Sequence, residues 1–125
     1  MNTFNVYQIL ITDDMINLVN QVGRAEAVKT YPAVGIKFDS MFGRKPLTAN
    51  DFAHYTKVAE VSAEGLNQVF EFTNTWERPE AVKKLRRMHS TSVGDVIHDT
   101  ETDKFWRVAM MGFDDVTNDI KQSAG

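Results

Sequence analysis

The stretch SVGDVIHDTETDKFWRVAMMGF, residues 92–113, decides the fold class. It contains two apolar segments of similar length, 92–99 and 104–113, which a polar turn separates. In the second segment Trp106 and Val108 lie on either side of Arg107, which is the two-residue period of a strand. The stretch therefore predicts a β-hairpin, and with it an antiparallel sheet.

Two further strands are predicted upstream of this hairpin. NVYQILI, residues 5–11, is rich in β-branched and aromatic residues and predicts a buried first strand. HYTKVAEVS, residues 54–62, mixes apolar and polar residues on both of its faces. That mixture favours a strand that is partly covered or at the edge of the sheet.

Helical spacing of apolar residues predicts helices between the strands. In the first, residues 12–23, Thr12 or Asp13 is expected to cap the start and Gly23 to end the helix. Ser62 is expected to cap a second helix that extends to Asn74. Its inward face is predicted to consist of Leu66, Val69, Phe70 and Thr73. Shorter helices are expected at 48–55, at 79–87 and within 114–125.

Residues 24–47 carry a weaker signal. RAEAVKTYP is compatible with a helical extension, but Pro32 disfavours helix at Tyr31. Two glycines and Pro46 then interrupt the apolar residues that follow. A loop whose aromatic side chains fold back on the core, or a short irregular strand, is predicted for this segment.

Together these elements predict one domain over residues 1–125, with the last few residues frayed. The expected fold class is α+β, with a small, mainly antiparallel sheet of about four strands and helices packed on one face. At 42% hydrophobic and 25% charged residues, the composition is that of a globular domain.

Charge and composition exclude several classes of function. A formal net charge of −3 disfavours a protein that coats nucleic acid. The chain has no cysteine, which excludes disulfides and thiol catalysis and fits a reducing compartment. Its apolar runs are too short to span a bilayer, and its N-terminus lacks the pattern of a signal peptide. A cytoplasmic protein without a membrane partner is therefore expected.

The polar residues form no recognisable catalytic or metal-binding motif. The histidines His54, His89 and His98 are not spaced as zinc ligands, and no HExxH motif is present. Ser90 and Ser92 lack the glycine-flanked elbow of a nucleophilic serine. No catalytic residue, metal or cofactor is therefore predicted.

A basic run precedes the hairpin. It comprises Arg78, Lys83, Lys84, Arg86 and Arg87. On a helix that begins at Pro79, Ala81, Val82 and Leu85 would face inward, and the solvent side would carry Lys83, Lys84, Arg86 and Arg87. They are interpreted as a solvated helix face or, alternatively, as a positive patch for phosphate or an acidic protein surface.

The loop that follows, MHSTSVGD (88–95), concentrates an imidazole, hydroxyls and a carboxylate. Gly94 suits a tight bend at the entry to a strand, and Asp95 is expected to accept hydrogen bonds from neighbouring amides. Hydroxyls such as those of Ser90 and Ser92 are expected to satisfy loop donors. We interpret the loop as a turn, and His89, Ser90, Ser92 and Asp95 as a secondary candidate for ligand binding.

The C-terminal half resembles the YodL-like family and related small proteins of phages and mobile elements. The match covers roughly residues 55–116, through LNQVFEFTN, HSTSVGDVI and a strand that ends in Gly-Phe. Trp106-Arg107 departs from the tyrosines of that pattern, and the first fifty residues match only through VYQI. Phe70, Asn74, His89, Ser90, Ser92, Val93, Asp95, Val96, Gly112 and Phe113 carry the match. The resemblance implies a small phage-type accessory protein that acts in the host cytoplasm.

Three functional hypotheses follow. The first is a non-enzymatic protein that binds a host or phage protein during host takeover or counter-defence. The second is a nucleic-acid-associated module that uses residues 78–87, and the third is a nucleotide-binding or small-molecule protein or enzyme with a site near His89–Asp95. A homo-oligomer is left open, because Phe105 and Ala109 suggest a second apolar sheet face.

Overall fold

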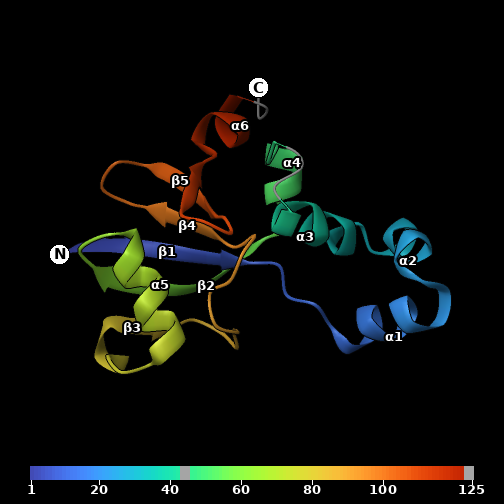
Figure 1. Ribbon diagram of the computed structural model, residues 1–125, viewed down its shortest axis with the longest axis horizontal. Helices are drawn as coiled ribbons and strands as arrows, with labels where there is room; N and C mark the ends of the chain where they lie inside the picture. Colours follow the sequence, from blue (N-terminus) through green and yellow to red (C-terminus); the bar gives the residue numbers. More distant parts are fainter. Residues whose placement is uncertain (43–45, 123–125) are drawn as a thin grey trace.

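The computed structural model describes residues 1–42 and 46–122. Within these residues six strands form one sheet in the order β3-β2-β1-β4-β5-β6, and every neighbouring pair is antiparallel (Figure 1). The α+β class and the antiparallel sheet are thus confirmed, with six strands rather than four. The strands are β1 Asn2–Gln8, β2 Thr56–Ala63, β3 Val82–Lys84, β4 Val96–Asp99, β5 Lys104–Val108 and β6 Phe113–Asp115.

The first strand of the chain lies in the middle of the sheet. It pairs with β2 on one side and with β4 on the other, so that Phe4 lies opposite both Val61 and Asp99. The register with β2 shifts by a bulge between Val6 and Tyr7. The predicted hairpin is β4–β5, in which His98 lies opposite Phe105.

Some of the helices pack on the sheet, and the others form an arm beside it. α1, α2 and α3 follow β1 and extend away from the sheet, on the right of Figure 1. Their bounds are Asp13–Val22, Arg24–Thr30 and Pro32–Phe42. The remaining helices are α4 Ala49–Phe52, α5 Leu66–Thr75 and α6 Thr117–Gln122, and a single 3₁₀ turn covers Pro79–Ala81.

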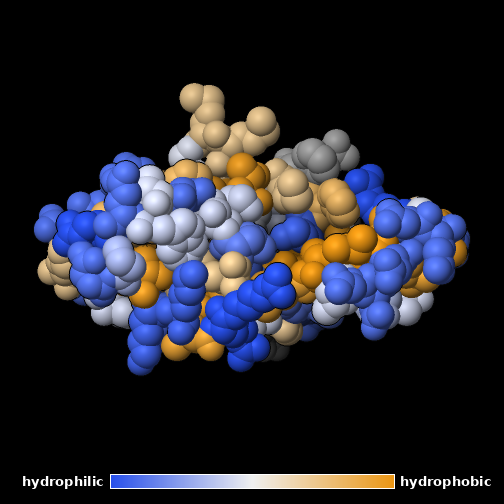
Figure 2. Space-filling model, turned by 90° about the horizontal axis from the view of Figure 1, so that it is seen from below, coloured by the Kyte–Doolittle hydropathy of each residue, from blue (hydrophilic) through white to orange (hydrophobic). Residues whose placement is uncertain are grey.

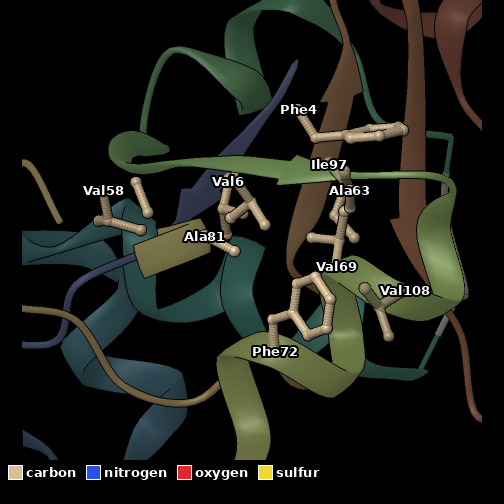
Figure 3. Packing of buried hydrophobic residues seen from close by; sticks show 11 residues of the cluster. Phe4, Val6, Val58, Ala63, Val69, Phe72, Ala81, Ile97 and Val108 are labelled. Atoms are coloured by element: carbon tan, nitrogen blue, oxygen red, sulfur yellow. The ribbon is translucent and has the colours of Figure 1, made fainter. Parts of the chain in front are cut away.

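Helices pack on both faces of the sheet, and not on one face as the sequence predicts. On one face Val69 and Phe72 of α5 pack against the strands, in a cluster that Figure 3 shows. This cluster includes Phe4, Val6, Val58, Ala63, Ala81, Ile97 and Val108. On the other face Phe52 of α4 and Ile120 of α6 join a second cluster with Val96 and Phe105. Phe105 is thus covered within the chain, in an edge-on contact with Phe52, and offers no apolar sheet face to a second copy.

The loop or irregular strand predicted for residues 24–47 is wrong for its described part, which forms α2 and α3. Pro32 begins α3, where its missing N–H is not needed, so it separates the two helices without breaking either. Gly35 lies against Val28, whose methyl carbons would stand 3.1 Å from an added Cβ. The glycine that suggested a loop therefore allows α2 and α3 to pack closely. Residues 43–45 of this segment, and the predicted fraying at 123–125, lie outside the described residues.

Two predictions about β2 and the helix after it are corrected. Of the two alternatives for β2, the edge strand is wrong, because β3 pairs with its outer side, whereas a partly covered strand is confirmed by its mixture of buried and half-buried residues. Ser62 belongs to β2 and does not cap α5, which begins after Gly65. Phe70 is exposed and Phe72 is buried in its place, so the inward face of α5 consists of the half-buried Leu66 and the buried Val69, Phe72 and Thr73.

The helix predicted from Pro79 to Arg87 is also wrong. Only its first turn is helical, and Val82–Lys84 form β3. A helix would have placed Lys83 one turn from both Arg86 and Arg87, and like charges at that spacing are destabilising. On the sheet, Lys83 lies opposite Glu60 instead. The strand predicted over 104–113 ends at Val108, and a turn at 109–112 leads to β6.

Candidate functional site

The loop that contains HSTSVGD is fixed to the central strand by Gln8. The Nε2 of Gln8 donates to the carbonyl of His89 at 2.9 Å and to Oδ2 of Asp95 at 3.0 Å. Its Oε1 accepts from the backbone N–H of His89 at 3.3 Å. One fully buried side chain, that of Gln8, thus holds both ends of the loop to β1.

Asp95 is a buried carboxyl at the end of this loop. Its Oδ2 also accepts from the backbone N–H of Ser92 at 2.9 Å, as the sequence predicts. Burial raises the pKa of the Asp95 carboxyl to about 6, although the hydrogen bonds from Ser92 and Gln8 and the charges of His89 and Lys37 lower it. Desolvation therefore outweighs the hydrogen bonds at this group.

The middle of the loop is attached to α5. The Oγ1 of Thr91 lies 2.6 Å from Oγ1 of Thr73, and both residues are buried. Asn74 donates to the carbonyl of Thr91 at 3.0 Å. Ser90 and Ser92 are exposed. The structure thus uses the loop mainly to join α5 to β1.

Gly94 lies at a tight approach between the loop and α3. Its φ is +94°, and an added Cβ would stand 3.1 Å from the backbone nitrogen of Met41. The Tyr55 hydroxyl donates to the carbonyl of Gly94 at 2.6 Å and lies 2.8 Å from Oγ of Ser40. Burial raises the pKa of this hydroxyl to about 12. The hollow between Lys37, Tyr55 and Asp95 has no room for a ligand.

The predicted basic residues differ in their partners. Arg78 pairs with Glu80, and Lys83 lies 3.8 Å from Glu60. Lys84 lies over the ring of Trp76 at 4.2 Å. Arg86 and Arg87 follow β3 on an exposed segment, where their side chains face solvent.

Arg87 and His89 border a hollow that the sequence does not predict. Together with Met88 they form one wall of a cavity of about 510 Å³, and residues 10–13, between β1 and α1, form the other. This arrangement requires residues 10–13, after β1, to lie beside residues 87–89, after β3. It brings an apolar floor, Leu10 and Ile11, next to a guanidinium and an imidazole.

A second, apolar cavity of about 160 Å³ continues from Ile11 along α1. Ile16 and Val19 of α1 line it on one side, and α3 lines it on the other with Val34, Lys37 and Phe38. We call the two cavities together the underside groove. Figure 2 shows an apolar band on this face, between long hydrophilic side chains at the centre and the lobe at the right.

Helix α1 leaves part of its apolar side uncovered. The sequence correctly predicts its start at Thr12, whose Oγ1 accepts from the N–H of Met15, and its end at Gly23. Met15, Leu18 and Val19 are half-buried, and Met15 packs against the second core cluster, whereas Ile16 and Val22 are 46% and 47% exposed. An amphipathic helix with an uncovered apolar side is a common feature of protein-binding surfaces.

The histidines lie apart. His54 is exposed, His89 borders the underside groove, and His98 stacks on Phe105 and bonds to Asp103. Among residues 1–42 and 46–122, no three His, Cys, Asp or Glu side chains are placed to hold a metal ion. No helix in the described part of the chain has the length and apolar character that crossing a bilayer requires.

Comparisons with protein-family models, with curated proteins and with solved structures found no match. The resemblance to the YodL-like family therefore stays a prediction. The residues that suggest it include Asn74, Asp95 and Val96, which hold or continue the loop.

Proposed function

We propose that this protein is a non-enzymatic binding protein that takes up a segment of another protein in the underside groove. The observation that supports the proposal most directly is α1, a ten-residue amphipathic helix on which the apolar residues Ile16 and Val22 are 46% and 47% exposed. Exposed apolar surface lowers the solubility of a protein unless a partner covers it. The groove beside α1 provides the hollow in which apolar side chains of that partner would lie.

The charges around the groove favour an acidic partner. Arg87 and His89 border its polar end, Lys37 borders its apolar end, and the exposed Arg86 precedes Arg87. Asp13 is the acidic residue of the lining. We expect an amphipathic segment whose apolar side chains contact Ile11 and Ile16 and whose carboxylates meet the two arginines.

The biological setting is the second half of the proposal. A small accessory protein of phage type, acting in the host cytoplasm on a host or phage protein, fits a domain of 125 residues that offers a groove for a partner. The absence of cysteine is compatible with that compartment.

A defined peptide tests the proposed chemistry. The probe is a fluorescent helical peptide with leucines at i, i+3, i+4 and i+7 and glutamates at the other positions; its control has lysines for the glutamates. Fluorescence anisotropy should show binding of the acidic peptide, weakened at high salt, and little binding of the basic one. Amide chemical shifts should change at Ile11 and Ile16.

Matched variants locate the binding. Arg86→Glu with Arg87→Glu should weaken binding by about tenfold or more. Lys29→Glu changes another exposed cation, on α2 and away from the groove lining, and should leave affinity unchanged. Equal affinity for both peptides, or an unchanged affinity in the arginine variant, would contradict the proposal.

Nucleic-acid binding is the second candidate, and the exposed Arg86 and Arg87 are the observation that favours it. A gel shift with labelled single-stranded and double-stranded DNA at two salt concentrations tests it. Binding that weakens steeply with salt and with the arginine variant supports this candidate. No shift at low salt removes it.

A further inference from the structure

The two edge strands of the sheet have the same pattern with opposite charge. β3 reads Val-Lys-Lys and β6 reads Phe-Asp-Asp. Within the part of the chain that the structure describes, no strand lies beyond either of them. Edge strands present unpaired backbone N–H and C=O groups, which makes them templates for pairing with another chain.

We infer that the β3 edge of one copy of this chain pairs with the β6 edge of a second copy, so that the sheet continues from molecule to molecule. The direction of the strands allows it. Neighbours alternate across six antiparallel strands, so β3 and β6 run in opposite directions. A second copy placed beside the first in the same orientation therefore adds an antiparallel strand.

The faces of the sheet also match. Residues directly opposite one another share a face, and one such row contains Lys83, Glu60, Asn5, His98 and Phe105. Arg107 is two residues beyond Phe105, hence on the same face, and Asp114 lies opposite Arg107. With Lys83 opposite Asp114 of the next copy, the cation and the anion lie on one face, while Val82 and Phe113 both lie on the other.

Charge selects this pairing over its alternatives. Charged residues on a short edge strand normally prevent pairing with a like edge. Two β3 edges would oppose lysine to lysine, and two β6 edges would oppose aspartate to aspartate. Only β3 with β6 places a lysine opposite an aspartate, Lys83 opposite Asp114, while Lys84 and Asp115 lie diagonally to each other on the other face.

Exposed apolar residues adjoin both edges. Leu85, directly after β3, is 42% exposed, and Met110 and Met111, in the turn before β6, are 84% and 93% exposed. The register that opposes Lys83 to Asp114 brings Leu85 beside the methionine turn. Each copy contributes one edge of each kind, so the assembly is head-to-tail and forms a ring or an open chain.

Charge exchange tests this inference. Sedimentation velocity over a concentration series should show self-association of the wild type that weakens as salt rises. Lys83→Asp and Asp114→Lys should each weaken it by about tenfold or more. An equimolar mixture of the two variants should associate again, because each altered edge then meets an opposite charge.

The mixture separates an interface from a loss of fold, since two misfolded variants would not restore each other. If Asp114→Lys does not fold, Lys83→Asp alone carries the test: it should fail to bind itself yet bind immobilised wild type through its unaltered β6. A monomeric wild type at every concentration, variants that associate as the wild type does, or a mixture that stays dissociated would each overturn the inference.

Discussion

Replacing Asp95 by Asn should change how the stability of this protein depends on pH. In the folded chain the Asp95 carboxyl is buried and its pKa is about 6, whereas its ordinary value is 3.8. Asparagine has nearly the same shape, and its carbonyl oxygen can accept the same hydrogen bonds from Ser92 and Gln8. The substitution therefore removes the ionisation and keeps the contacts.

The sign and size follow from the two pKa values. Between pH 3.8 and about 6 the folded state keeps a proton that the unfolded chain has lost, so stability falls as pH rises. The stabilisation by the protonated Asp95 carboxyl is fully present below the pKa of the unfolded chain. It is lost as pH rises through the pKa of the folded chain. One pKa unit corresponds to about 1.4 kcal/mol. As pH rises from below 3.8 to above 6, the free energy of unfolding of the wild type should therefore fall by about 3 kcal/mol relative to that of Asp95→Asn.

Urea denaturation of both proteins, at roughly pH 3.5 to pH 7.5, measures this difference. Asp103 and Asp115, whose pKa values are lowered by hydrogen bonds with Lys121 and Thr117 respectively, give the opposite pH dependence. They are present in both proteins and cancel in the comparison. If the free energy of unfolding depends on pH in the same way in both proteins, or if the wild type becomes more stable relative to the variant as pH rises, the reasoning that burial dominates the pKa of Asp95 is refuted.

Three further predictions concern the loop and the arm. Tyr55→Phe leaves the buried carbonyl of Gly94 without its donor and should lower the free energy of unfolding by about 1–3 kcal/mol in urea denaturation. Gly94→Ala should destabilise the protein more than Gly112→Ala. Both glycines have a positive φ, which costs an alanine about 1–3 kcal/mol, but only at Gly94 would the added Cβ press against Met41. Equal decreases in the melting temperature of the two variants would contradict this. Thr12→Ala should weaken the start of α1 by about 1 kcal/mol, seen as faster amide exchange in that helix with an unchanged midpoint of global unfolding.

The sequence predicts best those elements whose cause is local. Thr12 caps α1 by a hydrogen bond three residues away, and Thr48 and Asp51 form a capping box over the same distance. The β4–β5 hairpin likewise closes through a short turn, in which Glu101 donates to Asp99. In each case the residues that decide the structure are neighbours in the chain.

Predictions fail where a distant segment decides. Val82 is a strand residue because Val61 lies opposite it, and nothing in the local sequence announces that partner. In the local sequence Pro32 and Gly35 indicate interruptions of a helix. In the structure Pro32 begins α3, and Gly35 allows the side chain of Val28 to pack closely against α3. Local propensity is overridden by tertiary contacts in these places.

The candidate site shows the same division. The sequence predicts the turn-forming roles of Gly94 and Asp95, which the positive φ and the bond from Ser92 confirm. It does not predict that Gln8, more than eighty residues earlier, holds the loop. The underside groove is also missed, because an amphipathic helix has the same pattern whether its apolar side is covered or not.

The central position of β1 has a consequence for how the chain is made. Phe4 is synthesised more than ninety residues before its partner Asp99. Until then β1 has at most one neighbour, and its apolar side chains and one row of backbone groups stay open to solvent. Completion of the sheet therefore requires a closure over more than ninety residues, and a chain that has not yet closed it carries the aggregation hazard of an unpaired strand.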